Sequence, residues 1–182
     1  MKIDIEVVRE INQKINSRVK LAELLNSIMN IASKLVNAEG SSLLLSDIAT
    51  GDLIFNVVIG EKGELITGQR VPRGKGIAGI VAETHEPVIV NDAKNDPRIF
   101  RKIDKETKFE TKNLICLPMK IMDHFIGVLE IVNSIGRDSF NQEDLITGKF
   151  IADQAAIAIH NRKMYDDLAQ RMDELSALYE VS

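Results

Sequence analysis

Apolar residues recur every three to four positions in two segments near the N-terminus, the spacing that places them on one face of an α-helix. In the first segment these residues are Val7, Val8, Ile11 and Ile15. In the second they run over residues 21–35, and Gly40 is expected to cap the end of that helix. The pattern therefore predicts two amphipathic helices ahead of the first strand.

After Gly40 the pattern changes to short apolar runs separated by turn-forming residues, which is typical of β-strands. Residues 41–46 and 53–59 flank the turn Ala49-Thr50-Gly51-Asp52 and predict a hairpin. Further strands are expected over residues 65–71, 88–90, 114–121 and 125–132. The run at 65–71 is more polar and suits an edge strand. The last two runs are apolar on both faces and suit the middle of a covered sheet.

A glycine-rich loop, Pro72-Arg73-Gly74-Lys75-Gly76, precedes a short helix expected over residues 77–82. Backbone N–H groups at the start of such a helix suit an anion or a polar ligand group. Residues 74–79 also match the dinucleotide-binding pattern G-x-G-x-x-G. That pattern requires a full crossover helix, whereas Glu86-Pro87 ends this segment after about two turns. We therefore reject the dinucleotide interpretation.

A single long helix is predicted for the C-terminal part of the chain. Asn141 can cap its start, Phe140 can pack against Leu145, and no breaker interrupts it before about Tyr179. Its second half carries apolar residues at alternating steps of four and three, which is the seam of a short coiled coil. The seam residues are Leu168, Met172, Leu175 and Tyr179. We predict a homodimer through Leu168, Met172 and Leu175 together with Val8, Ile11 and Ile15.

Composition narrows the classes of function. The net charge of −4 argues against general affinity for nucleic acid or an anionic membrane. The chain has no apolar run of about 18 residues and no signal-peptide pattern, so a cytoplasmic location is expected. A single cysteine, Cys116, excludes an internal disulfide and a cysteine-based metal cluster. The three histidines show no metal-ligand or triad spacing, so we expect no enzymatic activity.

The order of the elements and several sequence blocks resemble the GAF domain over about residues 20–160. The blocks cover residues 21–32 with 38–45, 74–79, 91–93 with 95–98, 113–119 and 127–133. The resemblance implies an α+β fold with a central antiparallel sheet of about six strands. It places the N- and C-terminal helices on one face and a flap of loops and short helices on the other. Residues 1–20 would be a signalling helix, 21–160 the GAF domain, and 161–182 a coiled-coil linker helix.

The blocks are most similar to the cyclic-nucleotide-binding GAF domains of phosphodiesterases and adenylyl cyclases. In those domains the ligand lies between the sheet and the flap, and this likeness implies six ligand-binding residues in the present chain. Ser42 would contact the base, Ile77 and Ala78 the phosphate through backbone groups, Asp104 and Thr107 would close the flap, and Glu130 would reach up from the sheet. Glu130 is the one charge within residues 125–132, so it either contacts a ligand or lies at a salt-bridged or solvated rim.

The same domains carry a signature of Asn-Lys, a later Phe, then three residues and Asp-Glu. Asn133 and Phe140 are present here, but Ser134 stands in place of the lysine. Two residues separate Phe140 from the acidic pair Glu143-Asp144. The lysine–aspartate pair of the signature is therefore expected to be absent.

The resemblance implies a non-catalytic sensory module of a larger cytosolic protein in bacterial signalling. It would bind a small molecule, for which a cyclic nucleotide is one candidate, and would transmit through dimeric terminal helices to an output domain. No other cofactor is expected. The alternative is a ligand-free GAF dimerisation module whose pocket is filled by its own side chains. Methionine-sulfoxide reductases of GAF type use several cysteines, so the lone Cys116 argues against that enzyme.

Overall fold

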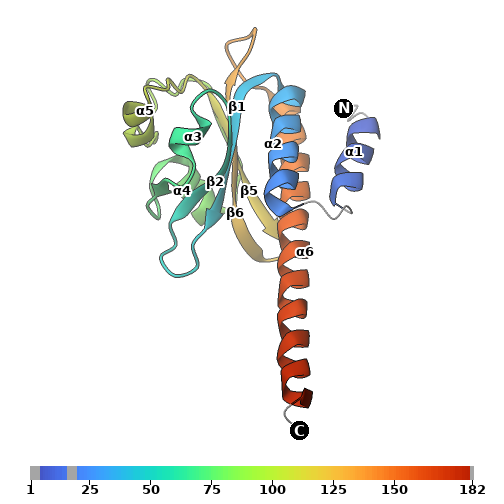
Figure 1. Cartoon of the computed structure of the whole chain (residues 1–182). Helices are drawn as coiled ribbons and strands as arrows, with labels where there is room; N and C mark the ends of the chain where they lie inside the picture. The colour runs from blue at the N-terminus through green and yellow to red at the C-terminus, as the bar shows by residue number, and fades with distance from the viewer. Residues whose placement is uncertain (1–4, 16–19, 181–182) are drawn as a thin grey trace.

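The computed structural model describes residues 5–15 and 20–180, which form one antiparallel sheet with helices on both faces (Figure 1). The six strands lie in the order β3-β2-β1-β6-β5-β4, so β1 and β6 are central. The strands are β1 (Ala38–Ser46), β2 (Leu53–Ile59), β3 (Arg70–Val71), β4 (Val88–Val90), β5 (Leu114–Ile121) and β6 (His124–Ser134). The predicted α+β fold with about six antiparallel strands is confirmed.

The helices divide between the two faces as the sequence predicts (Figure 1). One face is covered by α2 (Leu21–Val36) and the first half of α6 (Gln142–Glu180), with α1 (Ile5–Ile15) beside α2. The other face carries α3 (Gly63–Ile66), α4 (Gly76–Thr84) and α5 (Lys102–Thr107). The sheet thus separates a layer of long helices from a flap of short ones.

Two apolar cores follow from the alternation of side chains along the strands. Leu43 points into the core beneath α2 and α6, whereas its neighbour Leu44 points into the core beneath the flap. Leu129 and Val128 on β6 alternate in the same way. Both faces of the central strands are covered, which explains the continuous apolar runs at residues 43–45 of β1 and 125–129 of β6.

Two local predictions are wrong. The second helix ends at Val36, and its cap is Asn37 in the left-handed conformation (φ 53°), three residues before the expected cap at Gly40. Gly40 instead lies within β1, where a Cβ atom would sit 2.6 Å from the Ile59 carbonyl oxygen. The expected strand over 65–71 shrinks to the two residues of β3, because the chain first makes the helical turn α3.

The start of α6 is formed as predicted. The Asn141 side-chain oxygen accepts hydrogen bonds from the backbone N–H groups of Glu143 (2.8 Å) and Asp144 (3.2 Å). Phe140 and Leu145 pack in the same core. The helix then runs well beyond the domain, and residues 161–179 are exposed (Figure 1).

The N-terminal part of the predicted dimer surface needs correction. Ile11 is only 1% exposed and packs in the core of its own chain, so it is not available to a second copy. Val8 is half-buried, and the side chain of Ile15 lies outside the described residues. Leu168, Met172 and Leu175 are exposed on α6, so this part of the predicted interface stays a prediction.

Candidate functional site

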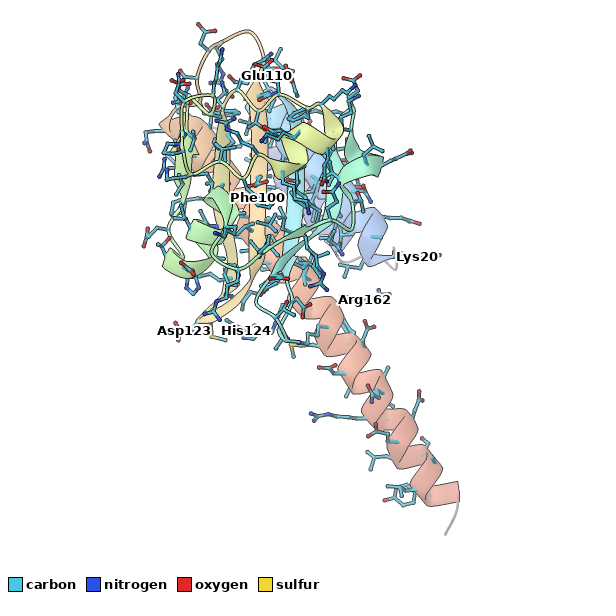
Figure 2. All side chains as sticks on the ribbon, turned by 90° about the vertical axis from the view of Figure 1, so that its left-hand side faces the viewer. Lys20, Phe100, Glu110, Asp123, His124 and Arg162 are labelled. Carbon is cyan, nitrogen blue, oxygen red and sulfur yellow. The ribbon has the colours of Figure 1, made fainter. Side chains whose placement is uncertain are left out.

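A cavity of about 110 Å³ lies between the sheet and the flap. Strands β1 and β6 form its floor, α3 and the start of α4 form walls, and α5 with the flanking segments covers it. Three aromatic rings line it: Phe55 on β2, and Phe100 and Phe109 on either side of α5. Figure 2 looks onto this flap, with Phe100 near the middle of the face.

The glycine loop fits tightly against the flap. Gly76 has φ 69°, and a Cβ atom there would lie 2.8 Å from the Cβ of Phe100. A Cβ on Gly79 would lie 2.7 Å from the backbone of Gly74. These glycines let the loop and residues 99–100 close together over the cavity. Helix geometry leaves the first-turn N–H groups of Gly76, Ile77 and Ala78 without an intrahelical acceptor at the cavity wall.

Glu130 lies on the cavity floor, on strand β6. In the sheet register it is opposite Ser42 on β1 and Cys116 on β5. The Ser42 hydroxyl donates a hydrogen bond to Glu130 Oε2 at 3.3 Å. Burial raises the pKa of Glu130 to about 7, the Ser42 hydrogen bond opposes this rise, and the nearby Asp104 carboxyl adds to it. Glu130 is therefore close to half protonated at neutral pH.

Asp104 faces the same cavity from α5. Its Oδ1 atom accepts a hydrogen bond from the Thr111 hydroxyl at 3.0 Å, and Thr111 also lines the cavity. Burial raises the pKa of Asp104, while the Thr111 hydrogen bonds oppose this rise. Two carboxyl groups with raised pKa values therefore share one largely apolar cavity.

Five of the six residues expected to bind a ligand line this cavity: Ser42, Ile77, Ala78, Asp104 and Glu130. Thr107 does not. Its hydroxyl donates to the Ile103 carbonyl oxygen at 2.7 Å and accepts from the Phe109 N–H at 3.3 Å, so it closes the end of α5.

Sequence reasoning missed Thr111 and the three phenylalanines. Phe55 and its neighbour Ile54 point to opposite faces of β2, and this alternation is a signal that could have placed Phe55 on the cavity face. Residues 99–111 show no periodicity that would have placed Phe100, Phe109 or Thr111.

Cys116 is fully buried, and burial raises the pKa of its thiol, so the side chain is inert packing as its place in an apolar strand predicts. Among the described residues, no group of three or more histidine, cysteine, aspartate or glutamate side chains is arranged to hold a metal ion. No helix in this part of the chain is long and apolar enough to span a membrane.

An ion pair between Arg137 and Asp144 holds the start of α6. Asp144 follows Phe140 after three residues, which is the spacing of the signature's aspartate, so Asp144 and not Glu143 occupies that position. The lysine–aspartate pair is absent, but Arg137 Nη2 meets Asp144 Oδ1 at 2.7 Å and the Val36 carbonyl oxygen at 2.8 Å. The Arg137 guanidinium also lies 5.9 Å from the centre of the Phe140 ring.

Buried amides join the end of the flap to this ion pair. Asn133, in the left-handed conformation, accepts a hydrogen bond from the Lys112 N–H and donates to the Glu110 carbonyl oxygen. Asn113 donates to the Ser134 hydroxyl, which in turn donates to the Arg137 carbonyl oxygen. The segment that follows Thr111 is thereby tied to the loop that leads into α6.

The fold and the cavity define a class: an α+β domain in which one covered pocket lies on the opposite side of a sheet from its terminal helices. A family model described as GAF domain matches residues 20–159. The chain belongs to the GAF domain family. The matched part of its curated relatives is their regulatory GAF region and not the catalytic domain.

Two of these relatives are phosphodiesterases. One is a probable 3′,5′-cyclic phosphodiesterase, pde-5, of Caenorhabditis elegans, 31% identical over 173 residues that cover 90% of this chain and 24% of the relative. Another is the dual 3′,5′-cyclic-AMP and -GMP phosphodiesterase 11A of Takifugu rubripes, 31% identical over 191 residues that cover 97% and 21%. The chain thus spans about a quarter of the length of such relatives or less.

Solved structures agree on the fold. The GAF domain from a phosphoenolpyruvate-protein phosphotransferase of Coxiella burnetii superposes with a TM-score of 0.78 at 21% identity, covering 90% of this chain and 96% of that one. Free methionine-R-sulfoxide reductase from Neisseria meningitidis superposes with a TM-score of 0.72 at 17% identity, covering 88% and 90%.

Proposed function

We propose that the chain is a non-catalytic regulatory module that binds a small molecule in the cavity and transmits occupancy through its terminal helices. The observation that carries the proposal is the buried Glu130 carboxyl on the cavity floor, held by Ser42 and surrounded by apolar side chains. Convergent polar groups in an otherwise apolar pocket are the usual form of a small-molecule site. A pocket filled by its own side chains would not need an ionisable group there.

Cyclic nucleotides are the first candidates because the curated relatives are named as cyclic-nucleotide phosphodiesterases. The first-turn N–H groups of Ile77 and Ala78 suit a phosphate, and Ser42 with Glu130 suits the polar edge of a base. The cavity of about 110 Å³ is smaller than the cavity of about 150 Å³ that holds benzene in another protein. A nucleotide would therefore enter only with an outward movement of the segment that carries Phe100.

A thermal melt with cyclic GMP and with cyclic AMP tests this proposal. A nucleotide present at about 100 times its dissociation constant should add about 2.7 kcal/mol to the free energy of unfolding. In a domain of this size that raises the melting temperature by about 5 to 10 °C. Ala78→Arg places a long side chain in the cavity and should abolish the shift relative to its own ligand-free melt.

A shift that survives in Ala78→Arg would place binding outside the cavity and contradict the proposal. The absence of a shift with either nucleotide would remove cyclic nucleotides from the candidates. A cavity that no small molecule enters would favour the ligand-free dimerisation module instead.

Transmission requires that the exposed part of α6 pairs with a second copy. Leu168, Met172 and Leu175 are each more than half exposed and lie on one stripe of the helix. The segment after the flap is joined to the start of this helix through Asn113, Ser134 and Arg137. A ligand that moves the flap is therefore expected to shift α6 relative to its partner helix.

Leu168→Lys is expected to raise the dissociation constant of the dimer about 30-fold, because it removes about 2 kcal/mol of apolar burial at the seam. Sedimentation equilibrium measures the constant. Gln170→Lys is the matched control, since residue 170 lies on the outer face of the same helix. This substitution should leave the dissociation constant of the dimer unchanged. A wild-type chain that is monomeric at high micromolar concentration would contradict dimeric transmission and the dimerisation module alike.

A further inference from the structure

Two carboxyl groups face the cavity, and one of them, Asp104, lies within electrostatic reach of the Arg101 guanidinium, which partly offsets the rise in its pKa that burial causes. Glu130 lies on its floor and Asp104 in its cover, and the Asp104 carboxyl raises the pKa of Glu130 electrostatically. Within the part of the chain that the structure describes, neither forms an ion pair with a lysine, arginine or histidine. The other charged residues that line the cavity are Glu61 and Lys62, on the loop that leads into α3.

This arrangement is unfavourable in the empty protein. Like charges in an apolar enclosure oppose each other's ionisation, and a buried carboxylate without a partner loses its hydration. The hydroxyls of Ser42 and Thr111 each donate one hydrogen bond, which partly replaces that hydration but brings no charge. A cation between the two carboxyls would remove both penalties.

The rest of the lining suits an organic cation better than a hydrated metal ion. Phe55, Phe100 and Phe109 present aromatic surface around the cavity, and the faces of aromatic rings attract positively charged groups. The described residues also offer no cluster of metal ligands at this site. Apart from Ser41 and four glycines, the remaining neighbours are aliphatic, so a ligand here needs a small apolar body behind its charged end.

We propose that the ligand carries an organic cation with at least two N–H donors, such as an amidinium, guanidinium or primary ammonium group, and that this group binds between Glu130 and Asp104. The inference rests on the proposed small-molecule site and specifies the chemistry of its ligand. A neutral donor, such as an amide or the edge of a purine base, is the competing chemistry that the experiment separates.

The probes are acetamidinium chloride and acetamide, which have nearly the same shape and differ in charge. Both have four non-hydrogen atoms and fit a cavity of this volume. Amide NMR shifts of Ser42, Ala78 and Glu130, followed at constant ionic strength and pH 8, report binding at this site. We expect acetamidinium to bind at least tenfold more tightly than acetamide.

Glu130→Gln should bring the two dissociation constants together while leaving the affinity for acetamide within about twofold. Glu61→Gln, at another position of the same lining, is the matched control and should preserve the preference.

The preference should also weaken as pH falls from 8 to 5.5, because Glu130 takes up a proton over this range. The titratable groups that face it are Asp104 from α5 and Cys116 from β5.

Equal affinity for the two probes, or an unchanged preference in Glu130→Gln, would overturn the inference. These results bear on the inference separately from the proposed function. Stabilisation by a cyclic nucleotide without binding of acetamidinium would retain the small-molecule site and reject its cationic ligand. Tight binding of acetamidinium at Glu130 without stabilisation by either nucleotide would support the cationic ligand and reject the nucleotides.

Discussion

Glu130→Gln is expected to stabilise the protein by about 3 kcal/mol at pH 8.5 and to change its stability little at pH 4.5. Burial raises the pKa of Glu130 from 4.5 to about 7. The folded protein therefore holds this proton more tightly than the unfolded chain. The contribution of this proton to the free energy of unfolding is fully present below pH 4.5 and is lost as the pH rises through about 7. Glutamine stays neutral throughout and avoids the loss.

Urea unfolding at the two pH values measures the effect directly. In a separate thermal melt at pH 8.5, the melting temperature of Glu130→Gln should exceed that of the wild type by about 6 to 12 °C. Glu61→Gln removes a negative charge from an exposed residue of the same lining and is expected to change stability little at either pH. If the stability difference between Glu130→Gln and the wild type were the same at both pH values, the pKa of Glu130 would be the same in the folded protein and the unfolded chain, and burial would not raise it.

Gly127→Ala is expected to destabilise the protein by at least about 3 kcal/mol, a large overpacking effect for one methyl group. Gly127 lies on β6 and is paired with Leu45 of β1, the other central strand. A Cβ atom at this position would overlap the Leu44 carbonyl oxygen. That oxygen belongs to the backbone of the neighbouring strand and cannot turn aside as a side chain does. The new methyl group must therefore push the central strands apart.

The matched control is Gly148→Ala on α6. Its added Cβ would meet the Leu117 Cδ1 methyl at 2.6 Å, which is the end of a side chain that can change rotamer. Alanine also favours a helix over glycine by about 1 kcal/mol. The net change should therefore stay within about 1 kcal/mol, as measured by urea unfolding of the purified variants. Equal losses in the two variants would show that β1 and β6 tolerate a wider separation than this packing indicates.

Much of the fold could be predicted because its signals are local. The apolar runs at 114–121 and 125–132 indicate central strands, and the glycine loop with its short helix indicates where a ligand would meet backbone N–H groups. The ordered blocks of the GAF resemblance then arrange these elements. The resemblance implies that Ser42 and Glu130 share one site, and the register of β1 and β6 places them opposite each other.

The rest depends on contacts between distant residues. Asn37 and Gly40 are both acceptable helix ends by propensity, and packing of Gly40 against Ile59 decides between them. Residues 65–71 carry enough apolar residues for a strand, yet Gly63 packs against the Val58 carbonyl oxygen and the chain turns there. Arg137 replaces a lysine expected at position 134. Only the folded loop shows that its guanidinium reaches Asp144.

In the proposed transmission, the packed first half of α6 would be the pivot about which its exposed second half tilts. Residues 161–179 extend about 28 Å at 1.5 Å per residue. A tilt of about 5° at the pivot would move the far end by about 2.5 Å, a displacement comparable to helix shifts at subunit interfaces in allosteric proteins. Under this proposal, a change in the flap too small to alter the sheet would move the end of α6 far enough to change its packing against the partner helix.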